Sequence, residues 1–190
     1  MSNLSTTAAD DALSFFTSGT TYYLGLCTAA PGASGESTTS LPFQAITFGA
    51  PSAGSQASTD SQTFSGVPGS VTYTDFSVWT GASSTLSASV TSGTAYTSLA
   101  VDALPAALAS GASVTLVDGT DTQIFVTSAS VASGATSIPV TSQDANYSYP
   151  VGTTVVEGTY IAGGTLSSSI TPSAGSNVDI ATGGITFTAS

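Results

Sequence analysis

Eleven carboxylates and a single thiol are among the side chains of this chain that are able to do acid–base or metal chemistry. The 190 residues include no lysine, arginine or histidine, and the net charge is −11. A serine or cysteine nucleophile therefore has no imidazole or amine base, and a phosphate has no cation to hold it. A pair of carboxylates is the remaining catalytic arrangement that could hydrolyse a substrate. The composition predicts a protein that is not an enzyme and needs no cofactor.

The carboxylates are scattered along the chain rather than paired around aromatic residues. They are Asp10, Asp11, Glu36, Asp60, Asp75, Asp102, Asp118, Asp121, Asp144, Glu157 and Asp179. Asp75, four residues before Trp79, is the one acid with the aromatic neighbour that a sugar-cleaving site uses. One such acid without a partner does not make a glycosidase.

Asp118 and Asp121 flank a short Gly-Thr turn and form a weak Ca²⁺ candidate, because Ca²⁺ takes carboxylate ligands in such loops. The turn offers too few ligands for a calcium loop, so an ordinary β-hairpin is the favoured interpretation. Zinc is excluded, since the chain has no histidine and only one cysteine, Cys27. Cys27 lies in an apolar run, which predicts a buried, unreactive thiol.

Three tyrosines form the candidate ligand-contacting set. Tyr96, Tyr147 and Tyr149 could line a surface that contacts carbohydrate, since an aromatic face can stack on a sugar ring. The alternative is that they pack loop edges together. The sequence leaves both interpretations open.

The charge balance also limits the partners. Nucleic acid is excluded as a direct partner because binding to it rests on cations that neutralise phosphates. An anionic membrane surface is disfavoured for the same reason, and no apolar stretch is long enough to cross a membrane. The N-terminus has no basic region followed by an apolar stretch, so we expect no secretory signal.

The pattern along the chain predicts an all-β protein with one short helix. Ser5 or Thr6 is the expected cap of that helix, Asp10 and Asp11 favour its positive end, and Gly19 ends it. Phe15 and Phe16 belong to its apolar face. Strands are then expected at 21–28, 43–48, 62–64 and 71–80, separated by Gly and Pro clusters. Neither face of 71–80 is purely apolar, which predicts a strand covered on both faces.

A pattern of strand, connector, Gly, strand and acidic-Gly turn occurs twice between residues 81 and 159. The first copy runs over 98–101 and 111–119, the second over 137–140 and 152–158, and another strand is expected at 123–127. Two repeats of about 40 residues would pack together, since one alone buries too little surface. We expect a separate small β-module here.

Three segments outside that module resemble a family of tailed-phage virion proteins, usually labelled tail-fibre or minor structural proteins. The family pattern Y-x-A-L-H-T-A-x-P-G is matched by YLGLCTAAPG at 23–32, with Cys27 where the family often has histidine. Its Q-A-I-T-F-G-A-x-S-x-G segment is matched at 44–54, without the arginine that usually precedes it. Its G-x-V-T-H-F-G-I-W segment is matched by GSVTYTDFSVW at 69–79.

The resemblance implies an antiparallel, sandwich-like β-domain made of residues 1–80 and 160–190, with the module 81–159 inserted. In the family the third segment soon reaches a G-G-T-L hairpin; here GGTL occurs at 163–166, so the module is expected inside that hairpin. The first domain would anchor the chain in the particle, and the module would protrude. By analogy, the chain is expected to assemble with itself as a homotrimer and with other virion proteins of capsid or tail.

The function implied is that of a structural protein on the virion surface, made in the host cytoplasm. Tail-fibre or minor tail protein and head decoration protein both fit this description. The alternative is a host-recognition module that binds cell-surface glycan through the tyrosine-bearing loops. A bacterial adhesin is a third class, which the missing signal peptide argues against.

Overall fold

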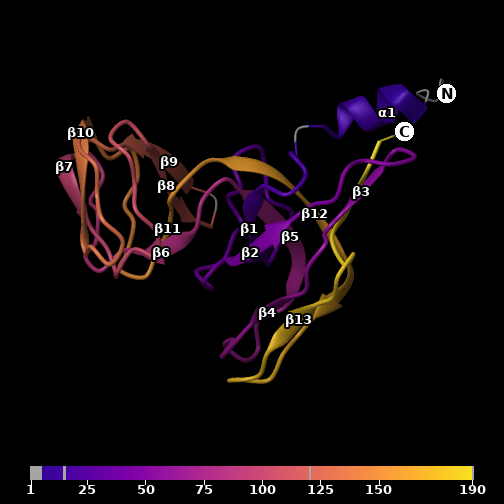
Figure 1. Ribbon diagram of the computed structural model, residues 1–190. Coiled ribbons are helices and arrows are strands. Elements are labelled where there is room, and N and C mark those ends of the chain that lie inside the picture. The colour runs from indigo at the N-terminus through magenta and orange to yellow at the C-terminus, as the bar shows by residue number, and fades with distance from the viewer. Residues whose placement is uncertain (1–5, 15, 120, 190) are drawn as a thin grey trace.

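The computed structural model describes residues 6–14, 16–119 and 121–189, and it confirms the all-β, antiparallel prediction (Figure 1). One helix, α1, spans Thr6–Ala12. The strands are β1 Thr21–Cys27, β2 Gln44–Thr47, β3 Ser55–Ala57, β4 Gln62–Phe64, β5 Tyr73–Trp79, β6 Ser83–Thr85, β7 Ala95–Ala100, β8 Ser113–Asp118, β9 Asp121–Val126, β10 Ser137–Asp144, β11 Thr154–Val156, β12 Tyr160–Ile170, β13 Val178–Ile180 and β14 Thr186–Thr188. Residues up to 80 and from 160 are called the base unit, and residues 81–159 the module.

The base unit is built on a four-stranded antiparallel sheet with the order β12-β5-β1-β2. The three segments that resemble the virion family contribute β1, β2 and β5, which are neighbours in this sheet. Strand β5 is buried along nearly its whole length, as its mixed faces predicted. The family-like segments therefore form three consecutive strands of one sheet, with β2 at its edge.

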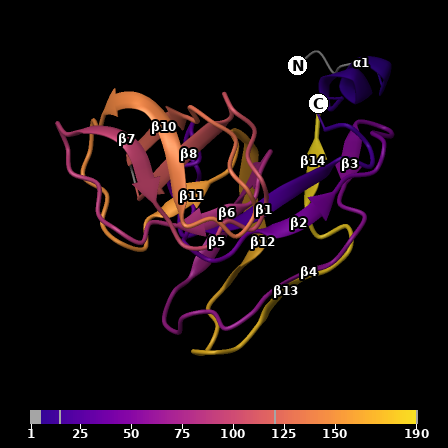
Figure 2. The same cartoon turned by 60° about the vertical axis from the view of Figure 1, so that its left-hand side comes forward.

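A long two-stranded ribbon covers one face of that sheet. β3 pairs with β14 and β4 pairs with β13, and backbone bonds at Ser58 and Val67 continue the ribbon between and beyond these strands. Its apolar side chains pack with those of the sheet in one cluster, which includes Phe48, Phe64 and Phe76. Figure 2 shows the ribbon on the side of the base unit away from the module. This packing gives the base unit its sandwich-like core.

Helix α1 is shorter than the sequence predicted and ends at Ala12 rather than near Gly19. After it the chain turns so that Phe16 enters the core and stacks on Phe48, with ring centroids 4.4 Å apart. Burying this ring stabilises the fold more than another helical turn of Thr, Ser and Gly would. Ser5 and Phe15, the expected cap and face residues, lie outside the described residues.

Asp10 and Asp11 also differ from the expectation, because both lie in the second half of α1 and not at its positive end. Asp10 instead accepts a hydrogen bond from the Gly54 backbone N at 2.7 Å. The carboxylate therefore joins the helix to the loop before β3, rather than stabilising the helix dipole.

The module has two sheets whose strands are related by an internal pseudo-two-fold. The order β6-β11-β8-β9 places the corresponding strands of the two copies, β8 and β11, side by side, and β7 pairs with β10 in the second sheet. Val90 and Tyr149 exchange two backbone hydrogen bonds at 2.8 Å, and Leu108 and Val131 exchange two at 2.9 Å. Val131 lies 41 residues after Val90 and Tyr149 lies 41 residues after Leu108, so these pairs occupy equivalent positions in the two copies. The two copies thus enclose one common core.

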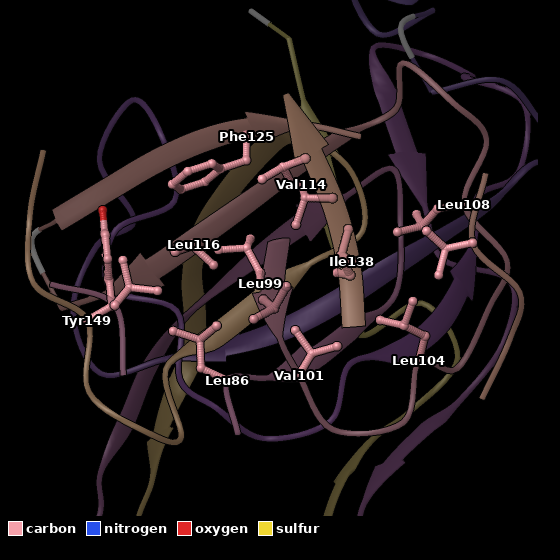
Figure 3. Packing of buried hydrophobic residues seen from close by; sticks show 14 of the residues in the cluster. Leu86, Leu99, Val101, Leu104, Leu108, Val114, Leu116, Phe125, Ile138 and Tyr149 are labelled. Carbon is pink, nitrogen blue, oxygen red and sulfur yellow. The ribbon is translucent and has the colours of Figure 1, made fainter. Parts of the chain in front are cut away.

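That core draws only on residues between Leu86 and Val155 (Figure 3). It includes Leu99 and Ile138, which face each other across the β7–β10 pair, and Val114 and Val155 on the other sheet. A third, small cluster of Phe43, Trp79, Val117 and Val156 joins the module to the base unit.

The GGTL segment is not a hairpin in this chain. Residues 163–166 lie inside the continuous strand β12, where Gly163 pairs with Ser77 and Gly164 with Phe76. The connection between β5 and β12 is the whole module. Because that module links two adjacent antiparallel strands, β12 continues along β5 without a turn of its own, although its register shifts between Tyr160 and Ala162 and between Thr165 and Ile170.

Candidate functional site

The two chain segments that enter and leave the module form a narrow neck. Tyr160 is paired with Trp79 across β12 and β5, and the Thr80 backbone N donates to the Thr159 carbonyl at 3.1 Å. A Cβ at Gly81 would collide with the Glu157 carbonyl, so the two segments pack backbone to backbone. The neck therefore fixes the module on the base sheet at a point that only glycine allows.

Trp79 is the central side chain of this neck and is fully buried. Its Nε1 donates to the Ser77 Oγ at 2.9 Å, and the Ser77 and Thr38 hydroxyl oxygens lie 2.8 Å apart. The Thr38 hydroxyl also donates to the Gly35 carbonyl at 2.8 Å. Gly35 lies against the indole with a φ of +76°, where a side chain would collide with the ring. This buried chain of hydrogen bonds ties the loop before β2 to the neck.

Asp75, the candidate acid beside Trp79, is occupied by structural hydrogen bonds. Its carboxylate accepts from the Thr74 hydroxyl at 2.6 Å and from the Thr165 hydroxyl of β12 at 3.0 Å. The side chain is buried between these strands. It therefore joins β5 to β12 and has the contacts of a structural residue.

Asp118 and Asp121 form the last pair of the β8–β9 hairpin, with Gly119 at a φ of +58° between them. This is the turn that the sequence favoured over a calcium loop. Across the described residues, no group of three or more His, Cys, Asp or Glu side chains is arranged to hold a metal ion.

The three candidate tyrosines are separated in the fold. Tyr149 is 0% exposed and belongs to the module core, which corrects the expectation that its ring contacts sugar. Tyr96 is half-buried, and its hydroxyl accepts a hydrogen bond from the Thr91 backbone N at 2.8 Å. Tyr147 alone is exposed, at 43%, with its ring edge-on to Tyr149. The structure brings Tyr147 and Tyr149 together but leaves only Tyr147 with an open ring face.

Cys27 is buried on β1, as the sequence predicted. Burial raises the pKa of its thiol to about 11, although hydrogen bonding with the Thr38 and Ser77 side chains offsets part of this rise. A thiol with this pKa is almost entirely protonated at neutral pH and is a poor nucleophile.

Glu157, the acid of the second expected acidic-Gly turn, is buried at the neck. Neither of its carboxylate oxygens has a hydrogen-bond partner among the described residues. Burial raises its pKa to about 7, and the Ala106 backbone amide, outside hydrogen-bonding geometry, offsets only part of that shift. We therefore expect the stability of the neck to depend on pH.

Two grooves flank the β8–β9 hairpin where the module faces the base unit. The first, called the junction groove, has a volume of about 420 Å³ and is lined by Gln123, Ile124, Gln143 and Asn146 of the module, with Ser34 and Tyr160 of the base unit among its other lining residues. No charged side chain lines it.

The second groove is larger, about 640 Å³, and is lined mainly by hydroxyl and aliphatic side chains. Asp118 and the exposed Val151 contribute to its wall. Two of its lining residues, Tyr73 and Thr153, have buried hydroxyls without a hydrogen-bond partner among the described residues. Because those hydroxyls are buried from solvent, a ligand in this groove could reach them only after the wall moved.

Comparison with known proteins finds no matching family model, no matching curated protein and no matching solved structure. In the part of the chain that the structure describes, no helix is long and apolar enough to cross a membrane.

The junction groove was not predicted from the sequence, although one signal for it exists there. The chain has only three asparagines and five glutamines, and Gln123, Gln143 and Asn146 lie within 24 residues of one another. Amide side chains fix the orientation of polar ligands, so a local excess of them in an amide-poor chain marks a place to inspect.

Proposed function

We propose that this chain is a non-enzymatic structural protein of a tailed-phage virion, exposed on the particle surface as a tail-fibre, minor tail or head decoration protein. The observation that carries the proposal is the resemblance of residues 23–32, 44–54 and 69–79 to such proteins. These segments form β1, β2 and β5, which are consecutive strands of the base sheet, with β2 at its edge. That the three segments pair with one another in one sheet supports the proposal that they belong to one family-like domain.

The arrangement of the two units supports this proposal. The module lies at the opposite end of the molecule from α1 and β14 (Figure 1). The base unit would contact other virion proteins and copies of this chain, as a trimer by analogy, and the module would point outward. A chain with eleven carboxylates, most of them outside the core, and no basic side chain would neither bind the packaged DNA nor attract other particles.

Immunogold electron microscopy on purified particles of the phage that encodes the chain tests the proposal. Label over the head would assign a decoration protein, and label on the tail would assign a tail protein. Particles that stay unlabelled while the protein is made in infected cells would refute the virion assignment. Light scattering of the purified chain measures its oligomeric state, for which three copies are expected.

Recognition of a host glycan is the second candidate function, and the junction groove favours it. The groove is uncharged in a strongly acidic protein, and amide, hydroxyl and aromatic side chains share its wall. Tyr147, the exposed member of the expected tyrosine set, follows Asn146 of the groove wall directly in the chain.

A further inference from the structure

The module wall of the junction groove carries amide groups that are held in place by the fold. The Asn146 backbone N donates to the Gln123 Oε1 at 2.7 Å, and the Gln123 Nε2 donates to the Asp144 carbonyl at 2.8 Å. These two bonds fasten the loop after β10 to strand β9. The Gln143 Nε2 donates to the Ile124 carbonyl at 3.1 Å, which orients a second amide. A polar wall that is already ordered loses little conformational entropy when a ligand binds.

Two amide side chains of this wall, one oriented by a hydrogen bond and one free, keep hydrogen-bonding capacity for a ligand. The Gln143 Oε1 has no partner among the described residues, and the exposed Asn146 side chain has none either. A primary amide offers two donors and a carbonyl acceptor, so it can bond to neighbouring hydroxyl groups of one ligand. Thr122 and Ser34 add hydroxyls on the two sides of the groove.

The base-unit wall supplies an aromatic ring whose orientation is also fixed. Tyr160 is half-buried, and its ring lies edge-on to Trp79 with centroids 5.4 Å apart and an interplanar angle of 67°. Trp79 itself is anchored through Ser77. A fixed, partly exposed ring beside ordered amides can pack on the C–H face of a sugar while the amides bind its hydroxyls.

The charge of the chain decides which ligands fit. No lysine, arginine or histidine is present to hold a carboxylate, sulfate or phosphate, and the net charge of −11 repels anions. The groove wall itself has no carboxylate to attract a cation. A volume of about 420 Å³ suits a small ligand, and small-molecule sites often lie between two structural units, as this one does.

We propose that the junction groove binds a neutral saccharide of one or two hexose units, with Gln143 and Asn146 bonding to its hydroxyls and Tyr160 packing on its ring. This proposal deepens the glycan-recognition candidate and rests on it, whereas the virion assignment stands independently. It moves the expected sugar contact from the buried Tyr149 to a different set of residues.

The test uses the purified full chain and a panel of neutral hexoses, N-acetylhexosamines and their disaccharides, followed by amide shifts in nuclear magnetic resonance spectra. We expect at least one sugar to bind with a dissociation constant on the order of 1 mM. The shifted amides should lie at residues 33–34, 122–124, 143–146 and 159–160. A sialylated sugar of the same size serves as the anionic probe and should not bind.

Matched variants locate the site. Asn146→Ala and Gln143→Ala should each weaken binding about tenfold, the loss of a ligand hydrogen bond. Asn177→Ala removes an amide that is also exposed but lies before β13, far from the groove, and should leave binding unchanged. Tyr147→Ala should change it less than twofold.

Other results would overturn the proposal in recognisable ways. Absence of shifts with every neutral sugar, or binding of the sialylated sugar alone, would refute the groove as a neutral saccharide site. Loss of binding in Tyr147→Ala with Gln143→Ala unaffected would place the site on the tyrosine loop and keep glycan recognition. The intact chain could also bind host cell walls, with neither Asn146→Ala nor Gln143→Ala weakening that binding. This result would keep glycan recognition as a function and refute the junction groove as its site.

Discussion

Trp79 and Tyr160 are paired across β5 and β12, and their rings meet edge-on with centroids 5.4 Å apart. The 80 residues between them in the chain form the module and its neck, so this one pair closes a very long loop. The hydrogen bond from Trp79 to Ser77 and the contact with Phe43 extend the pair into the base unit. Val117 and Val156 complete the same cluster from the module. The orientation of the module therefore depends on packing around a single indole.

Trp79→Ala should reduce the free energy of unfolding by about 3–5 kcal/mol, because it leaves a cavity in a fully buried cluster and removes the donor to Ser77. Urea denaturation followed by far-ultraviolet circular dichroism measures this loss. Tyr147→Ala, which truncates an exposed ring, is the control and should change stability by less than about 0.5 kcal/mol. A loss below about 1 kcal/mol in Trp79→Ala would mean that the neck is not the structural centre described here.

Glu157 should make the protein less stable as the pH rises from about 4.5 to about 7. Its pKa is raised from 4.5 to about 7 in the folded protein, so the folded state keeps a proton that the unfolded state has released in this range. Below this range both states are protonated and above it both are ionised, so the free energy of unfolding changes with pH only within the range. The full shift of the Glu157 pKa corresponds to a loss of roughly 3 kcal/mol in the free energy of unfolding.

Glu157→Gln should remove that part of the pH dependence, because the amide does not ionise. The variant should match the parent chain near pH 4 and exceed its stability at pH 8. Asp144→Asn, at an exposed carboxylate of β10, is the matched control for loss of one negative charge. Equal pH profiles for the parent chain and Glu157→Gln would contradict the buried, unpaired state of the acid.

Tyr149→Phe should leave the free energy of unfolding unchanged or raise it by up to about 1 kcal/mol. The Tyr149 hydroxyl is buried without a partner among the described residues, and burial raises its pKa, so the hydroxyl contributes no stabilising bond. Tyr149→Ala should cost about 3–5 kcal/mol, because the ring fills the module core (Figure 3). Thermal denaturation of both variants measures the difference, and a loss of more than about 1 kcal/mol in Tyr149→Phe would reveal a hydrogen bond.

A fragment of residues 82–157 should fold cooperatively by itself. Its core uses only residues between Leu86 and Val155, and the ends of the fragment are adjacent, joined by a bond from the Glu157 backbone N to the Ala82 carbonyl at 2.8 Å. Dispersed amide resonances and a single denaturation transition are the expected results. Leu99→Asp in the same fragment places a charge in the core and is the unfolded control. A disordered fragment beside a folded full chain would show that the module needs the base unit.

The sequence by itself determined the features that depend on local pattern and on composition. Alternation and Gly or Pro punctuation predicted the strands at 21–28, 43–48 and 71–80, since an apolar strand between turns has few other ways to bury its side chains. The absence of cations excluded most catalytic chemistry without any coordinates. The exclusion of nucleic acid as a partner remains a prediction of the same kind.

Only the tertiary structure decided the features that depend on which distant segments meet. Strands β3, β6 and β14 are three residues each and largely polar, and they form because partners far along the chain supply the hydrogen bonds. The GGTL segment became part of β12 because β5 extends beside it. The packing of distant segments also buries Tyr149 in the module core and leaves Tyr160 in the wall of the junction groove. Side-chain type indicates what a residue can do, whereas the packing of distant segments fixes whether it is exposed and what it contacts.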